Sequence, residues 1–221
     1  MTKPKVMIRE GLPTLPDRMR GLAIDARGYP VPWFVKFFDG KPDFRVADAA
    51  KFRKAITLGL CWICGEPLGV RRTFVLGPMC TVNRITSEPA THINCATFAA
   101  VVCPFLILPQ AKRRENNLPS GIKEPPGDHH PRNPGAVCLW TAKEYKVIPM
   151  AGGGRLIKIG EPLQTLWYAE GKFATRVQAE RALKAGIAIL YAKAKTMPRY
   201  DEAIIELENQ VAEAQQYLPM G

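Results

Sequence analysis

The alternation of apolar and polar residues predicts short strands and one helix in the first part of the chain. Two β-prone runs, residues 33–38 and 44–47, flank the turn sequence DGKP at 39–42, a combination typical of a β-hairpin. The segment "AAKFRKAITLG" that follows has helical spacing, with Asp48 placed as its N-cap and Gly59 as its stop. We therefore expect a hairpin followed directly by a helix.

In the second half of the chain, the same pattern predicts strands followed by two helices. Short β-prone runs occupy residues 137–159, with three consecutive glycines as a turn before residues 155–159. Thr175 is placed as the N-cap of an amphipathic helix. The last segment repeats its apolar residues at near-heptad spacing, which favours either packing on the chain's own core or a homo-oligomer seam: Ile204, Leu207, Val211, Ala214 and Leu218.

Composition divides the chain into four expected parts. Residues 1–47 form a proline-rich arm and the hairpin, and residues 48–115 hold five of the six cysteines. Residues 116–135 form a polar, proline-containing linker loop, and residues 136–221 form an α+β part with the two helices. The expected fold class is α+β, with short antiparallel strands and two C-terminal helices around a cysteine-bearing module.

Net charge and hydropathy limit the classes of function that the chain can have. The 31 basic and 20 acidic residues give a net charge of +11. Residues 48–114 hold nine basic and three acidic residues, so the surplus is densest around the cysteines, as in a nucleic-acid-binding module. The most apolar run, "ATFAAVVCPFLILP", has 14 residues and is too short to span a bilayer. Without a signal-peptide pattern either, we expect a cytoplasmic protein whose cysteines are thiols or metal ligands.

Two pairs of soft ligands have the spacing of a metal site. Cys61 and Cys64 lie in a turn between two glycines, and His92 and Cys95 lie where a helix is expected to begin. Side chains at positions i and i+3 share one helix face, so the second pair can converge on one ion. Three cysteines and one histidine complete the tetrahedral set of a structural zinc site. Cys80 is a possible substitute, most plausibly for His92.

This order of elements is that of a treble clef, in which a knuckle is followed by a hairpin and then by a helix that carries two ligands. We expect "EPLGVRRTFVLG" to form the hairpin. A redox role for Cys61 and Cys64 is disfavoured, because the pair follows a helix C-terminus and reactive pairs lie at helix N-termini. Cys103 is expected to be a buried thiol.

A catalytic role for the metal has little support in the sequence. Treble-clef nucleases carry a general-base histidine between knuckle and helix, and this chain has no histidine between Cys64 and His92. Phosphate-binding loops and serine nucleophile motifs are also missing from the sequence. One alternative stays open: Asp128, His129 and His130, with Asn133, could reach a metal from the linker loop.

The chain resembles an uncharacterised family of bacterial and phage-encoded zinc-binding proteins. The resemblance rests on "GYPVPWF", "DGKPDFRVAD", "LCWICGEPLG", "FVLGPMCTVNR", "SEPATHINCATFAAVVCPFL" and "WYAEGKFATR", and it spans most of residues 12–180. It implies a treble-clef-like metal site and a phage or bacterial context, and it implies no activity. Cys138 is an extra cysteine relative to that pattern.

Three hypotheses about function follow. The first is a zinc-stabilised protein that binds nucleic acid or a nucleoprotein complex. The second is an adaptor or inhibitor that binds a host protein machine, and the third is a metal-dependent nuclease. The first depends on basic clusters that are expected to contact phosphates, namely Lys51, Arg53 and Lys54; Arg71 and Arg72; and Lys112, Arg113 and Arg114.

Overall fold

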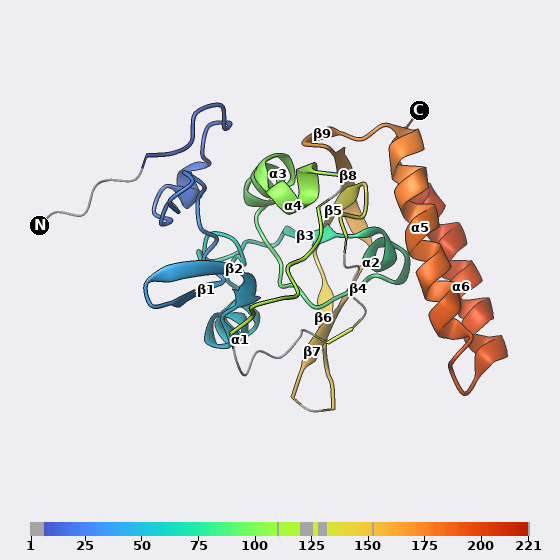
Figure 1. Cartoon of the computed structure of the whole chain (residues 1–221). Coiled ribbons are helices and arrows are strands. Elements are labelled where there is room, and N and C mark those ends of the chain that lie inside the picture. The colour runs from blue at the N-terminus through green and yellow to red at the C-terminus, as the bar shows by residue number, and fades with distance from the viewer. Residues whose placement is uncertain (1–6, 110, 120–125, 128–131, 152, 221) are drawn as a thin grey trace, which may run out of the picture.

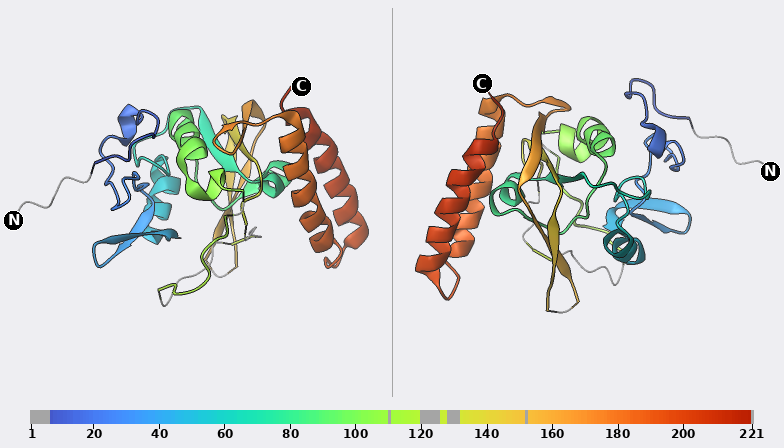
Figure 2. Two further views of the ribbon diagram at one scale, coloured as in Figure 1. Left: turned by 45° about the horizontal axis from the view of Figure 1, so that its top comes forward. Right: turned by 180° about the vertical axis from the view of Figure 1, so that it is seen from behind.

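The computed structural model describes residues 7–109, 111–119, 126–127, 132–151 and 153–220. These residues form a mixed α+β fold with three small antiparallel sheets and six α-helices (Figure 1). The N-terminal arm and the first hairpin lie at one end of the molecule, and the two C-terminal helices lie at the other (Figure 2). The expected fold class is thus confirmed at the level of α+β with short antiparallel strands.

The N-terminal elements form where the sequence predicts them. After a short 3-10 helix, η1 (Asp17–Met19), strands β1 (Val35–Phe38) and β2 (Lys41–Ala47) form the hairpin. The turn residues Asp39 and Gly40 both have positive φ angles, as a two-residue hairpin turn requires.

The helix α1 (Ala49–Leu58) begins and ends at the predicted signals. The Asp48 carboxylate accepts hydrogen bonds from the backbone N–H groups of Ala50 and Lys51, and Gly59 ends the helix in the left-handed conformation. The N-cap and the C-terminal glycine are therefore both confirmed.

The expected hairpin between the two ligand pairs is wrong. Its second half forms strand β3 (Arg72–Leu76), but β3 pairs with β5 (Val137–Ala142), more than sixty residues further along the chain. The chain does not return as a strand directly after β3, because Gly77 and Pro78 start the short helix α2 (Pro78–Asn83) there. After α2 come strand β4 (Ile85–Thr86) and helices α3 (Ile93–Val102) and α4 (Pro104–Ile107).

The central sheet has the order β3-β5-β8-β9, with β8 (Pro162–Ala169) and β9 (Lys172–Phe173). Strand β5 is buried along its whole length, because both of its faces are covered. Val137 and Leu139 pack with α3, whereas Cys138 and Trp140 point into the larger core under the C-terminal helices. Since β3 and β5 pair, residues on both sides of the expected linker share one sheet.

The second sheet has the order β4-β7-β6, with β6 (Tyr145–Pro149) and β7 (Arg155–Ile159). The predicted turn before residues 155–159 joins β6 to β7. The chain leaves the central sheet after β5 through residues 143–144 and returns to it through residues 160–161. These two crossings lie side by side, and the Gly160 N–H donates to the Glu144 carbonyl oxygen at 3.0 Å.

The chain ends in the helices α5 (Arg176–Ala194) and α6 (Tyr200–Ala214), followed by the 3-10 helix η2 (Gln215–Tyr217). Thr175 caps α5 in a capping box with Gln178, so the predicted N-cap is confirmed. Leu207, Ala214 and Leu218 of the near-heptad stripe are buried in the core of the same chain, and Ile204 and Val211 pack against it. The stripe therefore packs internally.

Candidate metal centre

The first ligand pair lies in a tight turn after α1, which we call the knuckle (residues 60–67). The Cys61 N–H donates to the Glu66 carbonyl at 2.8 Å, and an isolated bridge between Leu60 and Pro67 closes the turn. Gly65 has a φ of +81°, and a Cβ atom there would lie 2.7 Å from the ring of Trp33. Only glycine fits this position without rearrangement.

The second ligand pair lies at the start of α3. His92 is the N-cap residue of the helix and Cys95 lies in its first turn. The segment before the helix is fixed to strand β3 by two backbone hydrogen bonds between Thr73 and Thr91, at 2.9 and 2.7 Å. The predicted convergence at a helix start is therefore confirmed, with His92 one position before the first helical residue.

The four side chains form one cluster. The Sγ atoms of the three cysteines and a ring nitrogen of His92 all lie within 4.8 Å of one another. A tetrahedral zinc site with Zn–S distances of about 2.3 Å separates its sulfur atoms by about 3.8 Å. Cys61 and Cys95 are fully buried, and Cys64 is nearly so. The dimensions, the donor set and the burial fit a metal ion with four protein ligands.

The orientation of His92 matches that of a metal ligand. Its Nδ1 lies 3.4 Å from the Sγ of Cys64, while its Nε2 lies 3.1 Å from the carbonyl oxygen of Pro67. A carbonyl oxygen only accepts hydrogen bonds, so Nε2 carries the proton and Nδ1 presents a lone pair to the cluster. Metal-bound histidines are fixed in the same way, through a hydrogen bond from the second ring nitrogen.

The three thiols interact strongly with one another. Hydrogen bonds from the thiols of Cys64 and then Cys95 lower the pKa of Cys61, with further help from backbone N–H groups of Cys64 and His92. The contact with Cys61 raises the pKa of Cys64 to about 11 and also raises the pKa of Cys95. A thiolate at Cys61 thus disfavours ionisation of the other two thiols. A bound cation would let all three ionise together.

The N-terminal arm covers the cluster. Met19 is buried in the same small core as Cys61 and Cys95, and Leu12, Leu15 and Leu22 pack against this core. An ion pair of 2.6 Å between Arg18 and Glu66 joins η1 to the knuckle. The arm therefore belongs to the same structural unit as the candidate metal centre.

The remaining cysteines lie elsewhere, and all six cysteines are thiols rather than disulfides. Cys80, the expected substitute ligand, lies in α2 and packs against the core under the C-terminal helices. His92 is the fourth member of the cluster in its place. Cys138 is fully buried in the same core as Cys80, and burial raises its pKa. Cys103 caps the C-terminus of α3, and burial raises its pKa as well.

The eight basic residues expected to contact nucleic acid do not form one cluster. Arg53 and Lys54 are exposed on α1. Lys51 is half-buried and has a structural role, since its ammonium group donates to the Val35 carbonyl at 3.2 Å and lies over the ring of Trp33.

The loop after α4 carries three more of these residues. Arg114 forms an ion pair with Asp43 of β2, which fixes the loop against the first hairpin. Lys112 and Arg113 line a cavity of about 240 Å³ together with Glu115 and Arg132. Positive side chains therefore dominate this surface.

The arginines at β3 are separate from that surface. Arg71 is exposed, while Arg72 opens an edge strand of the central sheet rather than a projecting hairpin. The Arg72 guanidinium donates to the Lys143 carbonyl at 2.8 Å and lies over the ring of Tyr145.

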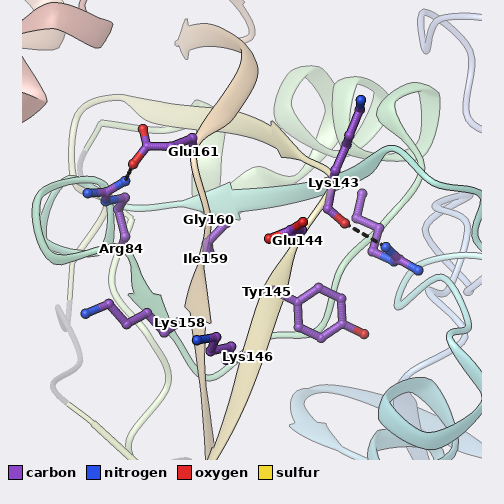
Figure 3. A pocket seen from close by; sticks show the side chains of 10 residues that line it. Arg84, Lys143, Glu144, Tyr145, Lys146, Lys158, Ile159, Gly160 and Glu161 are labelled. Carbon is purple, nitrogen blue, oxygen red and sulfur yellow. Dashed lines mark hydrogen bonds and ion pairs between the residues drawn. The ribbon is translucent and has the colours of Figure 1, made fainter.

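Sequence reasoning missed a basic groove next to Arg72. The groove has a volume of about 800 Å³ and lies where the chain crosses between the two larger sheets (Figure 3). Lys143, Lys146 and Lys158 line it, with Arg84 and two glutamates. In the sequence, the only sign of this groove is that lysines occur on two neighbouring strands. Their positions indicate a shared basic surface only once the register of β6 and β7 is known.

The alternative nuclease site cannot be assembled from the described residues. Asp128, His129 and His130 lie outside them. The Asn133 side chain donates hydrogen bonds to the carbonyl groups of Phe105, Leu106 and Leu108, at 2.8, 3.0 and 2.9 Å. Asn133 thus fixes the end of α4 and has a structural role.

Comparisons with protein-family models, with curated proteins and with solved structures find no match to this chain. Within the described ranges, no helix has both the length and the apolar character needed to cross a bilayer.

Proposed function

We propose that Cys61, Cys64, His92 and Cys95 bind a structural zinc ion. The orientation of His92 is the observation that carries the proposal, since its lone pair faces three sulfur atoms and its other nitrogen is already hydrogen-bonded. Three sulfur donors and one imidazole suit zinc, and they leave no coordination position for substrate. The metal centre then stabilises the fold and takes no part in a reaction.

We further infer that the metal centre is a treble-clef-like variant. A knuckle that supplies two ligands and a helix start that supplies two more support this inference. The departure is the strand between them, because β3 pairs with the distant β5 instead of forming a local hairpin.

We propose that the protein as a whole is a zinc-stabilised nucleic-acid-binding protein. The supporting observation is that basic residues outnumber acidic ones in the lining of both cavities described above, by five to two in the larger and by three to one in the smaller. The chain also carries 11 more basic than acidic residues. Open basic surfaces attract the phosphate backbone without requiring a particular base sequence.

Two measurements test these proposals. Elemental analysis of the purified protein is expected to give one zinc per chain, and this value should fall to near zero in Cys61→Ser/Cys95→Ser. Titration with generic duplex DNA and with RNA at low salt is expected to give binding that weakens linearly on a log–log salt plot. An intact, zinc-loaded protein that binds neither polymer would refute nucleic-acid binding and would favour the adaptor hypothesis.

A further inference from the structure

The basic groove contains two lysines in an unfavourable arrangement. Lys146 of β6 and Lys158 of β7 are direct register partners, so both side chains project from the same face of the hairpin. Both are exposed, and neither ammonium group meets a carboxylate of the described residues. Like charges directly opposite one another destabilise an antiparallel pair. Figure 3 shows the two side chains next to one another at one end of the groove.

Arg72, a further cation of the groove, is already held in position. Arg72 is fixed between the Lys143 carbonyl and the Tyr145 ring, and its Nε is a buried donor without an acceptor among the described residues. Lys143 lies in the crossing from β5 to β6 and is exposed. A guanidinium held in this way loses little conformational entropy when it meets an anion.

The acidic residues of the groove neutralise only part of this charge. Arg84 forms an ion pair with Glu161. Its Nη2 also donates to both carboxylate oxygens of Glu213 in α6. The Tyr217 hydroxyl donates to Glu161 as well. Arg84 and Glu161 therefore compensate one another. Glu144 is then the one remaining carboxylate among the lining residues, which include four further cations: Arg72, Lys143, Lys146 and Lys158.

We propose that this groove binds the phosphate groups of a nucleic-acid backbone, with Lys146 and Lys158 as the principal contacts. The inference rests on the proposed function and assigns its location. Bound phosphates would relieve the repulsion between the two lysines, neither of which forms an ion pair within the described part of the chain. The Tyr145 ring packs against Phe74 and Arg72, so it is not available for base stacking. Recognition is therefore of the backbone and independent of base sequence.

The test compares three double variants that each remove two exposed positive charges. Lys146→Gln/Lys158→Gln alters the groove, and Arg53→Gln/Lys54→Gln alters α1, which carries one of the three basic clusters predicted from the sequence. Arg181→Gln/Lys184→Gln on α5 is the matched control. Affinity for a short generic duplex is measured over a range of salt concentrations. The groove variant is expected to lose at least about tenfold in affinity at low salt and to reduce the log–log salt slope by about 1.8, or 0.9 per contact.

The outcomes separate the two proposals. If the unaltered protein binds neither DNA nor RNA at low salt, the proposed function fails, and the groove assignment fails with it. If the unaltered protein binds and the groove variant binds within about twofold of it, the groove assignment is overturned while nucleic-acid binding stands.

A stability measurement excludes unfolding as the cause of lost binding. Because Lys146→Gln/Lys158→Gln removes a like-charge pair, its Tm is expected to equal or exceed that of the unaltered protein. Lost binding combined with a lower Tm and lost zinc would count against the assignment.

Discussion

The region around the candidate metal centre and the region under the C-terminal helices are stabilised in different ways. Among the described residues, the cluster around the centre contains seven buried residues, and three of these are the cysteine ligands. The cluster under α5 and α6 contains twenty-two buried residues from both larger sheets and from the helices packed on them. Apolar burial alone can stabilise the second region, whereas the first has little apolar surface to bury.

This difference assigns a role to the metal. The knuckle and the start of α3 bring four potential ligand atoms together under the arm, so a bound ion would replace the missing apolar contacts. Small modules with structural zinc gain most of their folding free energy from metal binding. The two regions should therefore respond differently to metal removal and to changes in core packing.

Metal removal should have the largest effect, and it should be confined to one region. Chelation is expected to abolish amide protection in the arm and the knuckle, because the metal-binding energy of such sites is on the order of 10 kcal/mol. Amides of β5 and α5 should stay protected. Hydrogen exchange followed by mass spectrometry, with and without chelator, measures both regions at once. Equal loss of protection in both regions would show that the two regions unfold together.

A cavity in the C-terminal core should give the opposite pattern. Leu183 of α5 is 1% exposed, and Leu183→Ala is expected to lower the free energy of unfolding by about 2–5 kcal/mol. Zinc content in the folded protein should not change. Urea unfolding and elemental analysis make the comparison, with exposed Lys184→Ala as the control. A loss of zinc from folded Leu183→Ala would contradict the independence of the two regions.

A methyl group in the knuckle should affect the metal region alone. Gly65→Ala adds a Cβ within 2.7 Å of the Trp33 ring at a position with positive φ, and we expect a cost of about 1–3 kcal/mol. The cost should appear as weaker zinc binding in a competition titration with a chromophoric chelator. Gly69→Ala is the matched control, because nothing lies within 4 Å of a Cβ there and its φ is not positive.

Local signals in the sequence predicted much of the N-terminal region and the candidate metal centre. Asp48 and Gly59 fix both ends of α1, and the two pairs with two-residue spacing identify the four side chains that form the cluster. These predictions succeed because a cap or a turn depends on residues only a few positions apart. The capping box of α5 is confirmed for the same reason.

Features that depend on distant pairing could not be predicted. β3 pairs with β5, and nothing in the spacing of Cys64 and His92 indicates that partner. The groove lysines are twelve residues apart and meet only through the register of β6 and β7. Cys80 is near the ligands in sequence, yet α2 turns it toward the other core. Proximity along the chain was misleading wherever strand pairing decided the geometry.

The smallest expected effect concerns the ion pair between Arg84, which follows α2, and Glu161, which lies between β7 and β8. The hydrogen bond from Arg84 holds the pKa of Glu161 below its ordinary value of 4.5, against a small opposing effect of burial. The folded-state pKa is lowered, so the stabilisation is present above the unfolded-state pKa. It is lost as the pH falls through the folded-state value. Because the Glu161 side chain is 70% exposed, solvent screening keeps the contribution below about 1 kcal/mol.

Glu161→Gln should therefore be slightly less stable than the unaltered protein at about pH 7 and equally stable at about pH 3. Urea unfolding of both proteins across this pH range measures the difference in their free energies of unfolding. Loss of metal at acid pH affects both proteins equally, so it does not contribute to that difference. Glu208→Gln on α6 is the control, because Glu208 is exposed and forms no ion pair within the described chain. A difference that persists at the acid end would show that the substitution acts through packing. In that case the ion pair with Arg84 would not be the source of the stabilisation that Glu161 contributes.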